Sequence, residues 1–108
     1  MSAIPKYVYF RDAGQAATGL TPTFSSLVTS VNGTDKSGNA PTISEIGGGW
    51  YTFSVTFGTA PWDVITEELL AVVDGGVTLA DVDRYKEVTI TKADRVERQA
   101  NNEVYLPD

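Results

Sequence analysis

The fold of this chain is decided by the stretch Trp50-Tyr51-Thr52-Phe53-Ser54-Val55-Thr56-Phe57. Large apolar side chains alternate there with threonine and serine, and this period of two is typical of a β-strand with one buried face. The side chains predicted to face the core are Tyr51, Phe53, Val55 and Phe57. Trp50 falls on the polar side of the alternation, at the start of the strand, where an indole suits a contact at an edge or an interface.

Four further segments of the chain are predicted to be strands. They are rich in β-branched and aromatic residues and span residues 6–10, 20–29, 67–74 and 86–91. Pro22 has no N–H to donate to a neighbouring strand, so the strand over 20–29 is predicted to begin near a sheet edge. For the third segment one alternative stays open, because residues 63–69 could form a helical turn after Pro61.

The segments between the strands predict turns. Glycine-rich or polar turn signals occur at 11–14, 32–39, 47–49 and 75–76. One short helix is predicted, capped by Thr78 and ended at Arg84-Tyr85. Short strands with glycine turns and no long helix favour an all-β domain, an antiparallel β-sandwich of immunoglobulin or prealbumin type. This domain is predicted to span 1–91 and to be followed by a C-terminal arm over 92–108.

The composition excludes several classes of protein. The chain has 108 residues and a mass of 11.6 kDa, the size of one domain. It contains no cysteine and no histidine, which excludes disulfide scaffolds, thiolate nucleophiles, structural zinc sites and triads with an imidazole base. No apolar run approaches the roughly 20 residues that a membrane helix needs, so no membrane partner is expected. No secretory signal follows Met1, and synthesis in a cytoplasm is expected.

The charge of the chain is concentrated in one acidic segment. Of the 14 acidic residues against 8 basic ones, six acids and no base lie within residues 60–83. Nucleic-acid phosphates need a basic face, so no nucleic-acid partner is expected. Asp74, Asp81 and Asp83 could offer oxygens to calcium, but their spacing is not that of an EF-hand. Asp81 and Asp83 are instead expected to be a helix-start acid and an ion-pair partner of Arg84. No metal, cofactor or catalytic residue is predicted, and the protein is not expected to be an enzyme.

Three segments carry a resemblance to a known family. They read EIGGGWYTF at 45–53, VVDGG at 72–76 and LADVDRY at 79–85. In this order and spacing they resemble the small β-sandwich virion structural proteins of tailed bacteriophages, over roughly residues 5–91. The resemblance implies a non-enzymatic component of a phage particle, made in the host cytoplasm and located in the virion. It supplies no catalytic residue and fits both a capsid decoration (cement) protein and a tail or baseplate adaptor. The small size of the chain favours decoration, and the tail or baseplate adaptor is the alternative.

The arm over 92–108 predicts how such a protein would assemble. Its charges alternate in sign, and it carries a small apolar group formed by Val104, Tyr105 and Leu106. This group can bury little surface against a small domain, so we expect the arm to pack on a neighbouring subunit. The alternatives are that it folds back on its own sheet or forms a short helix. The expected assembly is a homo-oligomer, a trimer, that bridges subunits of the major capsid protein.

The two tryptophans leave a function of another class open. Trp50 and Trp62 are interface candidates, because tryptophan is enriched where proteins meet. Exposed aromatic rings also stack on sugar rings. A carbohydrate-binding module of a host-recognition device is therefore the alternative to a structural role.

Overall fold

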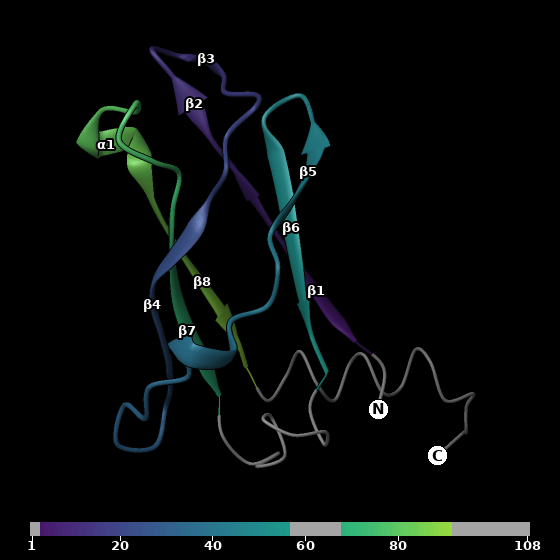
Figure 1. Cartoon of the computed structure of the whole chain (residues 1–108), viewed down its shortest axis with the longest axis vertical. Coiled ribbons are helices and arrows are strands. Elements are labelled where there is room, and N and C mark those ends of the chain that lie inside the picture. The colour runs from purple at the N-terminus through teal and green to yellow at the C-terminus, as the bar shows by residue number, and fades with distance from the viewer. Residues whose placement is uncertain (1–2, 57–67, 92–108) are drawn as a thin grey trace.

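The computed structural model describes residues 3–56 and 68–91, and in these ranges the protein consists mainly of antiparallel β-strands (Figure 1). One three-stranded sheet has the order β1-β6-β5, formed by Ile4–Tyr9, Trp50–Val55 and Ser44–Gly47. The other has the order β4-β7-β8, formed by Thr23–Thr29, Leu69–Asp74 and Tyr85–Ile90. The predicted all-β antiparallel class is confirmed, whereas the immunoglobulin or prealbumin type of sandwich stays a prediction.

The smaller elements connect the long strands. β2 (Arg11–Asp12) and β3 (Gln15–Ala16) form a two-stranded hairpin. At its tip, Ala13 and Gly14 have φ values of +52° and +85°, and two successive residues with positive φ are what a two-residue hairpin turn requires. Within residues 3–56 and 68–91 the helical elements are η1 and α1, at Ser37–Asn39 and Asp81–Arg84. Among the described residues, no helix has the length and apolar character needed to cross a bilayer.

The four flanking segments predicted as strands correspond to β1, β4, β7 and β8. β4 begins directly after Pro22 and is an edge strand of its sheet, because β7 is the one named strand beside it in the described ranges. β7 begins at Leu69, which the alternative assigned to a helical turn. Residues 63–67 of that alternative lie outside the described part of the chain.

The two three-stranded sheets pack against each other across one hydrophobic core. Tyr51, Phe53 and Val55 of β6 are all buried, and Phe57 lies outside the described residues. Phe24 of the opposite sheet meets Phe53 edge-on, with ring centroids 4.9 Å apart. Both sheets supply the remaining buried hydrophobic strand residues, which are Ile4, Val8, Leu27, Leu69, Ala71, Val73 and Ile90.

The buried hydroxyl of Tyr51 holds the chain between β3 and β4. It donates a hydrogen bond to the carbonyl oxygen of Ala17, at 2.9 Å, and accepts one from the N–H of Leu20, at 3.1 Å. A buried polar group without partners costs about 1–3 kcal/mol, so both bonds matter for the fold. They fix residues 17–20 against the first sheet.

The helix begins later than the sequence predicts. α1 begins at Asp81 and its N-cap is Ala80, with no side-chain cap, so the role predicted for Thr78 is wrong. The chain first makes a turn in which the N–H of Leu79 donates to the carbonyl of Gly76, at 3.2 Å. Because this turn buries Leu79 in the core, the helix can begin only after it.

Candidate functional site

The outer face of the β1-β6-β5 sheet carries exposed aromatic side chains. Tyr9 and Trp50 are cross-strand neighbours, and their ring centroids lie 5.0 Å apart at an interplanar angle of 49°. The Arg11 guanidinium lies 5.5 Å from the centroid of the Tyr9 ring, a cation–π contact. Tyr7 is 56% exposed and Trp50 is 46% exposed. These three aromatic residues, Tyr7, Tyr9 and Trp50, form what we call the aromatic face.

The alternation of β6 explains why Trp50 reaches the surface. Successive side chains of a strand point to opposite sides of the sheet. Since Tyr51 is buried in the core, its neighbour Trp50 points outward. The aromatic face is therefore presented by a sheet whose other side is fixed by core packing, a rigid base for binding.

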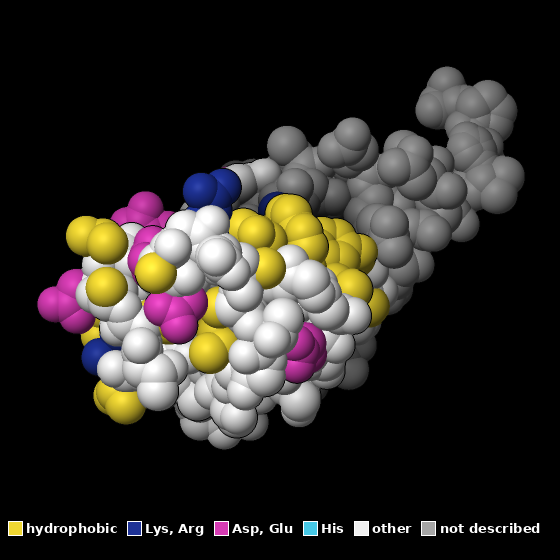
Figure 2. Space-filling model, turned by 90° about the horizontal axis from the view of Figure 1, so that it is seen from above, with side chains coloured by type: hydrophobic (Ala, Val, Ile, Leu, Met, Phe, Trp, Pro, Cys, Tyr) yellow, Lys and Arg dark blue, Asp and Glu magenta, His cyan; other side chains and the backbone are white. Residues whose placement is uncertain are grey.

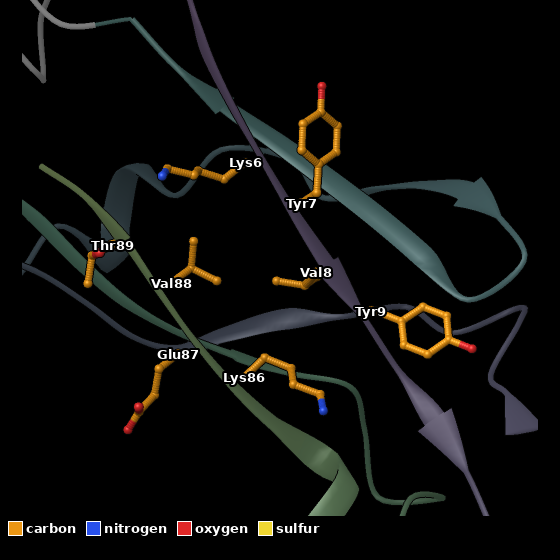
Figure 3. Close-up of a pocket in the computed structure, with 8 residues that line it drawn as sticks. All are labelled: Lys6, Tyr7, Val8, Tyr9, Lys86, Glu87, Val88 and Thr89. Carbon is orange, nitrogen blue, oxygen red and sulfur yellow. The ribbon is translucent and has the colours of Figure 1, made fainter. Parts of the chain in front are cut away.

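A groove of about 400 Å³ lies between β1 and β8, which are neighbouring edge strands of the two sheets. It is lined by residues 6–9 of β1 and 86–89 of β8. Val8 and Val88 point toward each other across it, whereas Tyr7 and Glu87 point away (Figure 3). The groove therefore has an apolar centre.

Two lysines occupy inward-facing positions beside this apolar centre. Lys6 is two residues before the buried Val8, and Lys86 is two residues before the half-buried Val88, so each lysine shares the side of its strand with a valine. Both lysines are themselves half-buried. An inward-pointing charge on an edge strand opposes the addition of a further strand. The groove is thus suited to side chains from a partner. The two lysines add positive charge beside its apolar centre.

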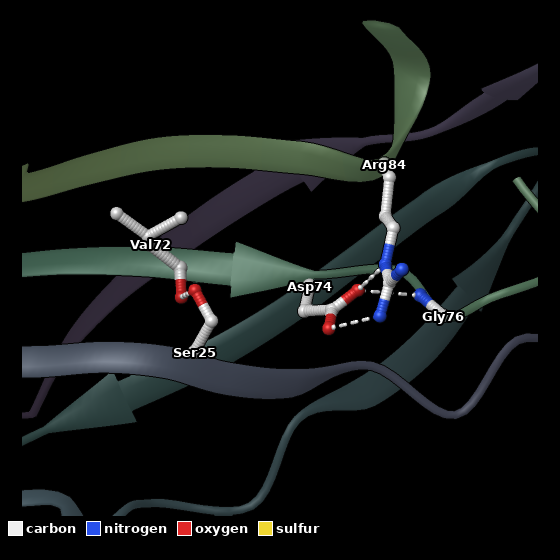
Figure 4. A network of polar contacts seen from close by, with 5 residues as sticks. All are labelled: Ser25, Val72, Asp74, Gly76 and Arg84. Carbon is white, nitrogen blue, oxygen red and sulfur yellow. Dashed lines mark hydrogen bonds and ion pairs between the residues drawn. The ribbon is translucent and has the colours of Figure 1, made fainter. Parts of the chain in front are cut away.

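The connection between β7 and β8, residues 75–84, is closed by an ion pair (Figure 4). The Asp74 carboxylate accepts hydrogen bonds from Nε and Nη2 of Arg84, at 2.7 and 3.0 Å, and one from the N–H of Gly76, at 2.8 Å. The bonds from Arg84 hold the pKa of the Asp74 carboxyl below its ordinary value, and the same pairing raises the pKa of Arg84.

The partner of Arg84 differs from the one expected. Asp81 and Asp83 lie in the first turn of α1, as acids at a helix start do. The ion pair of Arg84, however, is with Asp74 at the end of β7. Two parallel hydrogen bonds to one carboxylate match the planar guanidinium, and this geometry favours Asp74 over a neighbour on the same short helix.

The same connection presents an apolar tip. Val77 is 82% exposed and Val82 is 87% exposed, while Leu79 between them is buried and anchors the segment in the core. Asp81 and Asp83 flank Val82 along the chain. Figure 2 shows, at the end of the molecule that carries α1, hydrophobic side chains set among acidic ones. We call Val77, Val82, Asp81 and Asp83 the valine tip.

The acidic residues of this region do not converge. In the described residues, 3–56 and 68–91, no group of three or more His, Cys, Asp or Glu side chains lies close enough to hold a metal ion. The oxygens of Asp74 are used by Arg84 and Gly76. Asp35 is a second carboxyl with a lowered pKa, and it accepts a hydrogen bond from the N–H of Ser37, at 2.9 Å. Both carboxylates therefore hold local structure together.

The predicted interface residues are divided between the described and the undescribed parts of the chain. Trp50 lies on the aromatic face. The others, which are Trp62, Val104, Tyr105 and Leu106, lie outside the described residues.

No protein-family model, curated protein or solved structure matches the chain.

Proposed function

We propose that this protein is a non-enzymatic structural component of a bacteriophage virion, a capsid decoration protein that forms a homo-oligomer, a trimer, and bridges subunits of the major capsid protein. The observation that carries the proposal is the aromatic face on its rigid sheet, where Tyr7 and Trp50 are exposed and the half-buried Tyr9 lies against Trp50. Tyrosine and tryptophan supply much of the binding energy where proteins meet. The sequence resemblance to phage β-sandwich proteins supports the same function.

Asp74 and Asp35, two carboxylates of the described residues, have structural roles. A catalytic acid or base needs a pKa tuned toward the working pH. The carboxyls of Asp74 and Asp35 have pKa values that are lowered, away from neutrality, by hydrogen bonds within the fold. Their chemistry is that of structural carboxylates.

The net charge supports a protein partner. At −6 the chain repels nucleic-acid phosphates and anionic lipid surfaces. A capsid surface can offer complementary basic and apolar groups, and such contacts exist only in the assembled shell. Binding the shell in its native form then stabilises the shell by mass action.

The proposal is tested by locating the protein in purified particles. Labelled copies should be found by electron microscopy at regular positions on the capsid surface, with the aromatic face against capsid subunits. Copies confined to the tail or baseplate would replace the decoration role by that of a tail or baseplate adaptor.

A carbohydrate-binding function is the second candidate, favoured by the exposure of Trp50 beside Tyr9. An open pair of aromatic rings can stack on a sugar as well as on a protein. A glycan panel with tryptophan fluorescence separates the two functions. A saturable change that is lost in Trp50→Ala would support sugar binding, whereas a decoration protein should give no response.

A further inference from the structure

We propose that the valine tip of one copy of this protein docks in the groove between β1 and β8 of a second copy. This inference deepens the proposed self-assembly and rests on it, because it names the two surfaces through which copies meet. Both surfaces belong to the described residues, both have apolar groups, and their charges are opposite in sign. The tip is apolar and acidic, and the groove is apolar and basic.

The apolar parts of the two surfaces correspond. Val77 and Val82 are almost fully exposed, so their side chains gain from transfer out of water. In the groove, Val8 and Val88 point toward each other and leave a space of about 400 Å³ beside them. Valine side chains that enter this space would lie beside Val88 and the edge of Val8, at the apolar centre of the groove.

The charges of the two surfaces are complementary. Arg84 is bound to Asp74, so Asp81 and Asp83 give the connection between β7 and β8 an excess of negative charge. The groove carries Lys6 and Lys86, while the acidic Glu87 points away from it (Figure 3). When Val82 enters the groove, the exposed Asp81 beside it in the chain comes near Lys86. Opposite charges at this range select the partner and its orientation.

The tip is held in the shape in which it would bind. The bidentate bond between Asp74 and Arg84 closes the connection at its ends, the N–H of Gly75 donates to the carbonyl of Arg84 at 2.8 Å, and Leu79 is fixed in the core. A surface ordered before binding loses less entropy when it binds.

The same rigidity directs the tip to another molecule. α1 leads directly into β8 through Tyr85, and the groove begins at Lys86 on that strand. With the Asp74–Arg84 bond and the buried Leu79 in place, the tip cannot fold over onto the groove of its own chain. A second copy supplies a groove in the required position. Strand addition is a poorer use of the groove, because Lys6 and Lys86 face inward on both edges.

Sedimentation of the free protein over a range of concentrations tests the inference. The wild type should show an average mass that rises above 11.6 kDa with concentration. Serine at either valine of the tip, Val77→Ser or Val82→Ser, should weaken association by about tenfold. The matched control is Val31→Ser, at an exposed valine in the turn after β4, and it should associate like the wild type.

Charge exchange and mixing test the pairing itself. Asp81→Lys and Lys86→Glu should each weaken association, and the double variant should recover it because the pair is restored with reversed signs. A Val77→Ser/Val82→Ser protein and a Lys86→Glu protein should each remain monomeric, but their mixture should form a dimer through the one intact tip and the one intact groove. Thermal melts confirm that each variant is folded.

Three outcomes would overturn the inference. They are a wild type that stays monomeric at every concentration, tip variants that associate like the wild type, and a charge-exchanged double variant that is no better than its single parents. The binding of each variant to capsids is measured separately. Loss of the contact between tip and groove with capsid binding retained would overturn this inference alone, whereas loss of capsid binding by the wild type would overturn the proposed function.

Discussion

The carboxylate of Asp74 accepts two hydrogen bonds from the guanidinium of Arg84, and this pair joins the last residue of β7 to the last residue of α1. The two partners lie ten positions apart in the chain, and the segment between them carries the exposed valines. One ion pair therefore sets the shape of the surface that we assign to self-association. Two parallel hydrogen bonds between a carboxylate and a guanidinium fix the relative orientation of the two groups in addition to their electrostatic attraction.

Acid should weaken this ion pair. The pKa of Asp74 in the folded protein is lowered from the ordinary value of 3.8 by Arg84. A lowered pKa contributes stability that is complete above the ordinary value and is lost as the pH falls through the folded value. The difference in melting temperature between wild type and Asp74→Asn should be constant from pH 7 to about pH 5 and shrink below about pH 4. A difference that persists unchanged to pH 2 would contradict this role of Asp74.

Truncation of Phe53 should unfold much of the domain. Phe53 is buried and meets Phe24 of the opposite sheet, so Phe53→Ala is expected to cost about 3–5 kcal/mol, a large part of the stability of a small domain. Ser54→Ala, at the adjacent exposed position, is the control and should change the melting temperature little. Equal melting temperatures for the two variants would show that the strand register is wrong.

Gly49 should not tolerate a side chain. Its φ is +95°, and an added Cβ would lie 2.7 Å from Cε1 of Tyr9 and 3.1 Å from the carbonyl oxygen of Phe10. Gly48 is the control, because its φ is also positive, at +63°, but a Cβ there meets nothing within 4 Å. Gly48→Ala should lose only about 1–2 kcal/mol from backbone strain, and Gly49→Ala clearly more. Similar losses in denaturant unfolding would argue against the close approach of Tyr9.

Several parts of the fold could be predicted from the sequence, because they have a regular pattern. The period of two in β6 and the β-branched residues of β7 and β8 predict strands without knowledge of their partners. β5 could not be predicted in this way. Its residues are mostly exposed and show no alternation, and it is a strand because the glycine turn at 47–49 places it beside β6.

The groove and the valine tip were harder to predict than the aromatic face. Trp50 stands out by its position in a regular alternation, and the structure places it on the surface. Lys6 and Lys86 each occupy a position where the alternation of their strand calls for an apolar residue. This signal becomes informative only when the two edge strands are known to be neighbours. The exposure of Val82 depends on the turn that buries Leu79, and local sequence does not show that turn.

Removal of the C-terminal arm should leave the domain folded and weaken its attachment to the phage particle. The predicted domain ends at residue 91, and β8 ends at Ile90, so deletion of residues 93–108 should leave the melting temperature close to that of the wild type. We expect weaker attachment to the particle, because the arm is predicted to pack on a neighbouring subunit. The tip and the groove remain in the truncated protein, so part of its self-association should be retained. Equal mass and equal capsid binding in both forms, by light scattering and co-sedimentation, would remove the arm from the mechanism.

The disruption temperature of undecorated capsids, measured with and without the added protein, tests the central claim most directly. A decoration protein binds only the assembled shell, so the temperature should rise and then saturate as the protein is added. Trp50→Ala, which removes an exposed ring from the aromatic face, should raise it less, while Val31→Ser should match the wild type. An unchanged disruption temperature together with a saturable fluorescence response to a glycan would contradict the decoration role and favour sugar recognition.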